Sequence, residues 1–367
     1  MFTGKVIFFR TDASLNIGTG HVMRCLTLAK ELSRLGAQCR FITRAHQGNI
    51  AKHIESAGFI CHLLPSSNPT DNQSSGGYAL WLGCSQQQDA SESLAIIDSY
   101  KPDWLIVDHY ALDEEWESRI RTSVGKLMVI DDLANRKHVC DLLLDQNLGR
   151  QAQDYQTLIP AHCRQLYGPQ HALLRSEFSQ QRENSLARRK HGKCASILIT
   201  MGGIDKDNIT LRALDALKHS ALPPGCHINV VMGAMAPGIA QVKQAAALMP
   251  CGTSVLVGVS DMARLMAESD LAIGAAGSTA WERCVLGLPT IMVVIADNQR
   301  VIAEQLEERE ACLVIWQPEQ INEALPGLLA GLLADPDALR KLSQVGANLS
   351  DGAGVRRVAE AMSNKHD

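Results

Sequence analysis

Residues 270–282 read DLAIGAAGSTAWE and carry the most informative pattern in the chain. An apolar run that predicts a strand leads into a glycine, serine and threonine loop, which opens a predicted helix. Backbone amides of this loop, from Gly277 onward, can cradle a pyrophosphate, and the hydroxyls of Ser278 and Thr279 add donors. Glu282 lies one turn into the helix, where a carboxylate can accept both hydroxyls of a ribose. The alternative is an ordinary helix start whose acidic residue is favoured by the helix dipole.

The same alternation of strand and helix patterns extends through the whole sequence. Strands are predicted at 5–9, 39–43, 59–64, 105–107, 127–130, 142–144, 196–200, 228–232, 254–257, 271–273, 290–295 and 313–315. Helices are predicted at 21–35, 49–57, 113–122, 209–218, 239–248, 261–269, 280–286, 300–308 and 318–333. Two such series in succession predict an α/β protein of two doubly wound, Rossmann-like domains, whose parallel sheets face each other across a cleft.

The polar, charged stretch 180–193 is the predicted domain boundary. It separates an N-terminal domain, 1–180, from a C-terminal domain, 194–367, whose last helix is expected to pack back on the N-terminal domain. The stretch 66–88 is rich in serine, glycine, asparagine and glutamine and predicts a mobile loop. Pro326 is expected to kink or split the helix that contains it.

A second motif, RTDASLNIGTGH at 10–21, follows the first predicted strand and opens the first predicted helix. Gly18 and Gly20 permit a tight turn, and the helix start leaves amides free for an anion or a sugar hydroxyl. His21 lies in the first turn, where the dipole favours the neutral imidazole that a general base requires. A histidine bonded to a nearby carbonyl is the alternative. The motif is not a dinucleotide fingerprint, because Met23 stands in place of the third glycine.

Three further predicted strands end in polar residues. In LIVDHY, 105–110, the Tyr110 phenol could hold a substrate hydroxyl or amide, whereas an aspartate at a strand end often caps the next helix. The acidic pair 131–132 could bind Mg²⁺, although capping and turn roles are commoner. In TMGGID, 200–205, two glycines form either a phosphate-binding turn or an ordinary connection between strand and helix.

Composition narrows the function classes. The chain has 367 residues, 46% of them apolar, and its 35 basic and 39 acidic residues give a formal net charge of −4, which argues against a nucleic-acid binder. The 11 cysteines are odd in number and form no C-x-x-C, so they predict reduced core residues, and no metal site or disulfide framework is expected. No apolar run is long enough for a membrane span or a signal-peptide core. A cytoplasmic enzyme with a small-molecule substrate is expected, without nucleic-acid or membrane partners and as a monomer.

Together these motifs resemble a known family. Residues 257–299 are similar to the nucleotide-binding half of GT-B proteins such as the MurG-type N-acetylglucosaminyltransferases. The N-terminal R-x-D-x-S-x-x-I-G-x-G-H-x-x-R pattern, with IVDHY at 106–110 and MGGxD at 201–205, resembles the PseG family. Its members are UDP-2,4-diacetamido-2,4,6-trideoxy-β-L-altropyranose hydrolases of pseudaminic acid biosynthesis, which supplies flagellin glycosylation.

The resemblance implies a GT-B fold and hydrolysis at the anomeric C–O bond, with inversion and without a cofactor or metal. It assigns the general base to His21 and an active-site tyrosine to Tyr110. Nucleotide contacts are expected from Gly202, Gly203, Val259, Gly277, Ser278, Thr279 and Glu282. Substrate contacts are expected from Arg10, Asp12, Gly18, Gly20, Arg24 and Asn298.

Two other functions stay open at this stage. An inverting glycosyltransferase would use the same UDP site and a base in the N-terminal domain, but it would need an acceptor groove. A non-catalytic binder of nucleotide sugars would need neither His21 nor Tyr110. Whether Asp12 orients His21 is not decided by the spacing.

Overall fold

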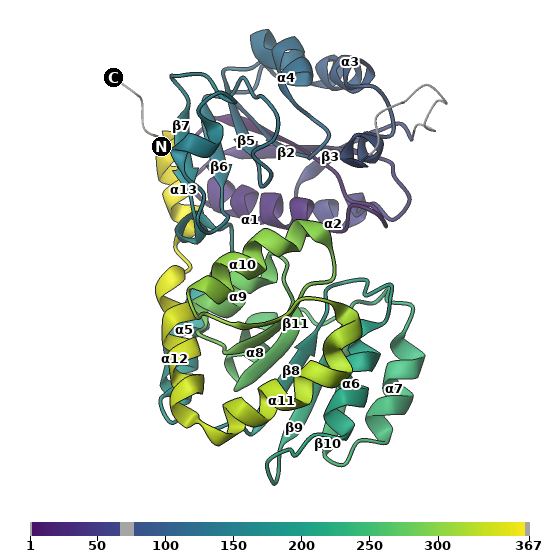
Figure 1. Ribbon diagram of the computed structural model, residues 1–367. Coiled ribbons are helices and arrows are strands. Elements are labelled where there is room, and N and C mark those ends of the chain that lie inside the picture. The colour runs from purple at the N-terminus through teal and green to yellow at the C-terminus, as the bar shows by residue number, and fades with distance from the viewer. Residues whose placement is uncertain (1, 67–76, 364–367) are drawn as a thin grey trace. The chain divides into compact units, whose positions relative to one another are not determined.

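The computed structural model describes residues 2–66 and 77–363, and the chain divides into two compact units (Figure 1). Unit 1 comprises Met1–Leu173 together with Gly354–Asp367. Unit 2 comprises Leu174–Ala353. Each unit contains its own parallel sheet and its own hydrophobic core.

The division between the units comes before the polar stretch 180–193 rather than within it. Most of that stretch belongs to helix α5 (Ser176–Arg189), which packs against α8 (Met262–Ala267) inside unit 2. Arg189 explains why a polar helix packs there, because its buried guanidinium donates to the backbone carbonyls of Met266 and Ser269. A charged stretch can therefore be part of a domain when its charges bond to the backbone of that domain.

The sheet of unit 1 has seven parallel strands in the order β3-β2-β1-β4-β5-β6-β7. They are β1 (Val6–Thr11), β2 (Gln38–Arg44), β3 (Ile60–Leu64), β4 (Trp104–Asp108), β5 (Lys126–Ile130), β6 (Leu142–Asp145) and β7 (Arg164–Tyr167). Strand β7 was not predicted, because its sequence RQLY carries a single buried apolar residue. The strand order reverses between β1 and β4, and ligands of such sheets bind at that switch point, outside the carboxyl ends of the strands.

Strand β1 is apolar over residues 6–9, because both of its faces are covered by apolar side chains. Phe9 belongs to one core cluster with helix α1 (Gly20–Arg34), and Phe8 belongs to a second cluster on the other face. Helix α1 buries a stripe that includes Leu28 and Leu32, each contributing about 1.5–3 kcal/mol. It ends before Gly36, which takes φ +99°, a left-handed conformation that favours glycine.

The remaining helices of unit 1 cover its sheet (Figure 1). They are α2 (Ala51–Ser56), α3 (Gln86–Ile97), α4 (Glu114–Ile120) and the chain's last helix, α13 (Gly354–Ser363). Helix α13 packs against α1, far away in sequence, and buries Val358 and Met362 in the same core cluster. The last helix is therefore part of unit 1, and unit 1 is built from both ends of the chain.

The sheet of unit 2 has six parallel strands in the order β10-β9-β8-β11-β12-β13. They are β8 (Ser196–Thr200), β9 (His227–Met232), β10 (Gly252–Val257), β11 (Leu271–Ala275), β12 (Thr290–Val293) and β13 (Leu313–Ile315). The order reverses between β8 and β11. The two glycine-bearing loops predicted to bind phosphate follow these two neighbouring strands.

The helices of unit 2 complete the second doubly wound layer. They are α5, α6 (Ile209–Lys218), α7 (Ile239–Ala247), α8, α9 (Thr279–Val285), α10 (Arg300–Glu308), α11 (Ile321–Ala334) and α12 (Pro336–Leu349). Pro326 does not split its helix, because α11 continues on both sides of it. Leu325 and Leu329 are fully buried, and their packing offsets the cost of the hydrogen bond that proline cannot donate.

The stretch 66–88 was predicted to be a mobile loop. Residues 67–76 lie outside the described part of the chain. Beyond them, Gly77–Leu82 forms a 3₁₀ helix, η1, and α3 begins at Gln86, so this half of the stretch is ordered secondary structure. None of the described helices has the length and apolarity needed to cross a membrane. All 11 cysteines are free thiols, and most are buried.

Candidate active site

His21 lies in the first turn of α1, directly after the loop that follows β1. Gly18 in that loop takes φ +77°, so a side chain there would be strained. The loop is held by its own hydrogen bonds, including one from the Gly18 amide to the Ser14 carbonyl at 2.9 Å. The His21 side chain is 10% exposed, so it is largely buried but still accessible.

Asp108 orients the imidazole of His21. It is the last residue of β4, beside β1, and its carboxylate lies 2.7 Å from His21 Nδ1. Burial raises the pKa of Asp108, but the Arg24 guanidinium and His21 outweigh burial and hold that pKa well below its usual value. The ionised carboxylate can only accept, so Nδ1 carries the proton and Nε2 has the free lone pair. Nε2 has no hydrogen-bond partner among the described residues.

Arg24 locks this pair in place. It lies one turn after His21 on α1, and its Nε and Nη2 both donate to the Asp108 carboxylate at 2.6 Å. Its Nη1 donates to Asp132, after β5, at 2.7 Å. A guanidinium in contact with two carboxylates through several bonds has few alternative positions, so the geometry around His21 is preorganised.

Tyr110 packs its ring against the ring of His21. The two ring centroids are 4.6 Å apart, with the rings perpendicular at 90°. The Tyr110 hydroxyl donates to Asp132 at 3.0 Å. Burial and the neighbouring Asp132 carboxylate raise the pKa of the phenol well above its usual value, so the phenol stays neutral. Because its proton is engaged by Asp132, the Tyr110 oxygen can accept a hydrogen bond from a ligand or water.

Two further aromatic residues lie beside Tyr110, and sequence reasoning missed both. Trp81 of η1 stacks on the Tyr110 ring, with centroids 5.6 Å apart and planes at 20°. Tyr78 meets Trp81 and Tyr110 edge-on, at 4.7 and 5.0 Å. The available signal was the segment GYALWL, 77–82, which concentrates aromatic residues in a chain that is only 4% aromatic.

The predicted contact of Arg10 and Asp12 with substrate is contradicted. Both side chains are fully buried, and Arg10 donates to both Asp12 and Asp89 with bonds of 2.6–3.0 Å. Asp12 also accepts from the Arg44 amide at 2.7 Å and does not touch His21. A ligand cannot reach these atoms in this structure, so the pair supports the β1 end of the sheet from within.

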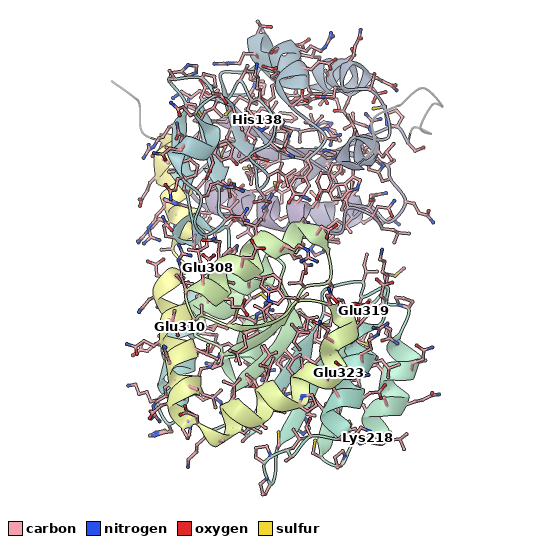
Figure 2. The ribbon with its side chains drawn as sticks, in the orientation of Figure 1. His138, Lys218, Glu308, Glu310, Glu319 and Glu323 are labelled. Atoms are coloured by element: carbon pink, nitrogen blue, oxygen red, sulfur yellow. The ribbon has the colours of Figure 1, made fainter. Side chains whose placement is uncertain are left out.

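A second closed network lies elsewhere in unit 1. His138, labelled in Figure 2, faces the Glu117 carboxylate at 2.6 Å, and both side chains are completely buried. The other ring nitrogen of His138, Nε2, has no hydrogen-bond partner within the described part of the chain, and no solvent reaches it. The His21 group differs, because its side chain is 10% exposed, so an incoming molecule can reach its Nε2.

In unit 2 the candidate groups are mainly backbone. Gly202, after β8, takes φ +95°, and a Cβ added at Gly202, Gly203 or Gly277 would meet no atom within 4 Å. These glycines therefore leave space for a ligand to approach the main chain. Ser278 precedes α9, and its side chain makes no capping hydrogen bond. Thr279 accepts a bond from the guanidinium of Arg283 at 3.3 Å.

Glu282 is partly buried on the first turn of α9. Burial raises the pKa of its carboxyl to about 7, although Arg175 and Arg283 oppose the rise. Its carboxyl oxygens make no hydrogen bond with any described residue, which leaves them available for two hydroxyl donors. Arg283, next in the chain, is buried and donates to the Ala275 carbonyl at 2.8 Å, which ties α9 to the end of β11.

Val259 lies after the edge strand β10, and Asn298 lies exposed in a short 3₁₀ turn after β12. Their roles toward a ligand stay predictions. Over the described ranges, no group of three or more His, Cys, Asp or Glu side chains is arranged to hold a metal ion.

Comparison with known proteins places these features in context. Residues 246–351, inside unit 2, match the glycosyltransferase family 28 C-terminal domain. The chain is 27% identical over 304 residues to the UDP-2,4-diacetamido-2,4,6-trideoxy-beta-L-altropyranose hydrolase of Campylobacter jejuni subsp. jejuni, over 83% of this chain and 96% of that protein. It is 26% identical over 295 residues to an uncharacterized protein of Methanocaldococcus jannaschii, over 79% of this chain, and spans 56% of that protein's length.

Solved structures show the same architecture. The crystal structure of Acinetobacter baumannii MurG matches with a TM-score of 0.69 and 16% identity, over 98% of this chain and 99% of that one. The GT-B fold predicted from the sequence is therefore confirmed, and so is the resemblance to the hydrolase family.

Proposed function

We propose that the protein hydrolyses UDP-2,4-diacetamido-2,4,6-trideoxy-β-L-altropyranose to UDP and the free sugar, a step of pseudaminic acid biosynthesis. The observation that carries the proposal is His21, whose Nδ1 proton is fixed by Asp108 and whose Nε2 is free. The relative from Campylobacter jejuni, named for this reaction, supports the choice of substrate.

In the proposed reaction, His21 Nε2 takes a proton from a water molecule. The water oxygen forms a bond to the anomeric carbon, on the face opposite the nucleotide, while the bond from that carbon to the phosphate oxygen breaks. The sugar is released with inversion, and UDP leaves as a stabilised anion that needs no proton. General-base assistance of this kind contributes about 10²–10⁴-fold in rate.

The neighbouring residues support this step in stated ways. Asp108 stabilises the imidazolium that forms, and Arg24 keeps that carboxylate in place. Tyr110, whose hydroxyl donates a hydrogen bond to Asp132, accepts a hydrogen bond from the attacking water or from a sugar substituent. In unit 2, amides of the Gly202–Gly203 turn and of the loop at Gly277 would bind the pyrophosphate, and Glu282 the ribose.

The decisive experiment uses a panel of UDP-2,4-diacetamido-2,4,6-trideoxyhexoses in H₂¹⁸O, without any acceptor, followed by NMR and mass spectrometry. Release of UDP, with the label in the sugar and with inverted configuration, is the expected result. Label in UDP would mean cleavage of the P–O bond and would contradict the mechanism. Tight binding without turnover would identify a binding protein.

The second candidate is an inverting glycosyltransferase acting on a UDP-sugar. The match of residues 246–351 to the glycosyltransferase family 28 C-terminal domain favours it, as does the structural likeness to MurG. It differs from hydrolysis in its acceptor. UDP release that is slow in water and accelerated by an added sugar or lipid acceptor would support transfer.

A further inference from the structure

We infer that Trp81 and Tyr78 form a subsite for an acetamido group of the sugar, and that this subsite sets the selectivity of the enzyme. Together with Tyr110 and His21 they make a continuous array of four rings, here called the aromatic wall. The inference rests on the proposed function, because it concerns the sugar held beside His21.

The aromatic wall is concentrated around the proposed base. The chain has five tryptophans and five tyrosines, and one of the former and two of the latter meet here. The His21 centroid lies 4.6 Å from Tyr110 and 6.4 Å from Trp81, and Tyr78 contacts both of those neighbours. Any group that approaches His21 Nε2 from this side therefore meets aromatic surface.

Trp81 offers two kinds of contact. Its ring is partly exposed, so it presents apolar surface in addition to the face that stacks on Tyr110. Its indole Nε1 makes no hydrogen bond to any described residue. This nitrogen is also not among the fully buried, unpartnered side-chain nitrogens of the described residues, so it is open to a ligand. It can therefore donate to a ligand.

An acetamido group matches both contacts. Its carbonyl oxygen accepts from the indole N–H, and its methyl group packs on an aromatic ring. A hydroxyl in the same place would bury a polar group against the rings and leave part of its hydrogen bonding unmet. The aromatic wall therefore favours a sugar that carries acetamido groups over one with hydroxyls at those carbons, and Trp81 is the main determinant.

The test compares kcat/KM for the diacetamido substrate with kcat/KM for its two analogues that carry a single acetamido group and a hydroxyl at the other carbon. Wild type is expected to prefer the diacetamido substrate over at least one analogue by about 10²-fold. Trp81→Ala is expected to reduce this preference about tenfold, mostly through KM. Trp81→Phe, which keeps a ring and removes the N–H, is expected to fall between the two. Trp316→Phe, in unit 2, is the matched control and is expected to behave as wild type.

The inference is overturned if Trp81→Ala keeps the wild-type preference, even if its stability and overall rate fall, since that pattern means a purely structural role. Failure of the proposed function is a separate result, namely no UDP release by wild type from any of these substrates. In that case the free 2,4-diacetamido sugar is titrated while tryptophan fluorescence is recorded. A signal that is lost in Trp81→Phe supports the subsite, and an absent signal or one that persists in this variant overturns it.

Discussion

Unit 1 and unit 2 present their candidate groups in different ways. In unit 1, side chains from α1, β4 and the segments after β4 and β5 are joined by short bonds around His21. In unit 2, the corresponding loops offer main chain beside Gly202, Gly203 and Gly277, with open space where side chains would be. The difference separates two tasks, since a proton transfer needs one titratable group held in a defined orientation, whereas an anion is bound by several amides.

The comparison predicts that changes in unit 1 act on turnover and changes in unit 2 act on binding. His21→Asn should give the largest effect, a fall in kcat of about 10²–10⁴-fold. Binding of UDP, measured by titration calorimetry, should be unchanged. His53→Asn, an exposed histidine on α2, is the control. Nearly full UDP release by His21→Asn would show that His21 is not the general base.

The next prediction contrasts two buried aspartates of unit 1. Asp108→Asn should lower kcat about 10²-fold, because the amide no longer fixes the Nδ1–H tautomer or stabilises an imidazolium. Asp12→Asn breaks the pair with Arg10 and should lower the free energy of unfolding by about 3–5 kcal/mol. Its kcat per folded molecule should stay within a few-fold of wild type. Chemical unfolding and active-site titration would separate the two effects, and a large loss of kcat in Asp12→Asn would contradict the distinction.

These two aspartates also show what could be predicted from the sequence. The alternation of apolar runs predicted two parallel-sheet domains, and His21, Tyr110 and Glu282 were predicted as site residues because α/β sheets place ligands in the loops after their strands. The sequence did not show that Asp108 faces His21, because the two are 87 residues apart and their contact depends on β1 lying beside β4. Arg10 was misassigned for the same reason, since its partner Asp89 is 79 positions away.

The missed elements have local causes. Trp81 lies in a stretch rich in serine and glutamine. The prediction of a mobile loop there rested on this polar composition and not on the aromatic residues. Strand β7 has half-buried polar residues and lacks the apolar run of a central strand. Pro326 was expected to kink or split its helix; the helix is not split, because tertiary packing of the flanking leucines holds it together.

The next prediction concerns unit 2, where a side chain can be added in the open space at Gly277. Gly277→Ala should weaken UDP binding about tenfold, because the new methyl group occupies space that a phosphate needs, while the free protein accommodates it without a clash. The temperature of unfolding should not change. Gly331→Ala, at another glycine with open space but within α11, is the matched control for adding a methyl group. Unchanged UDP affinity in Gly277→Ala would exclude this loop from the nucleotide site.

The smallest effect is expected at Glu282, the one titratable group proposed to contact the nucleotide in unit 2. In the free protein burial raises the pKa of its carboxyl to about 7. Ribose hydroxyls donate to the ionised carboxylate, so binding lowers this pKa and releases a proton below neutral pH. Affinity should therefore increase as pH rises toward 7 and level off above it, with a difference of up to about tenfold between pH 6 and pH 8.

Uridine is the ligand for this measurement, because its lack of phosphates leaves no ligand group to titrate in that range. Calorimetry with wild type should show the rise in affinity with pH. Glu282→Gln should bind uridine with an affinity that does not depend on pH, and 2′,3′-dideoxyuridine should give wild type the same flat profile. A pH dependence that survives in Glu282→Gln would assign the titration to another group, and the nucleotide site of unit 2 would then consist of main chain and hydroxyls alone.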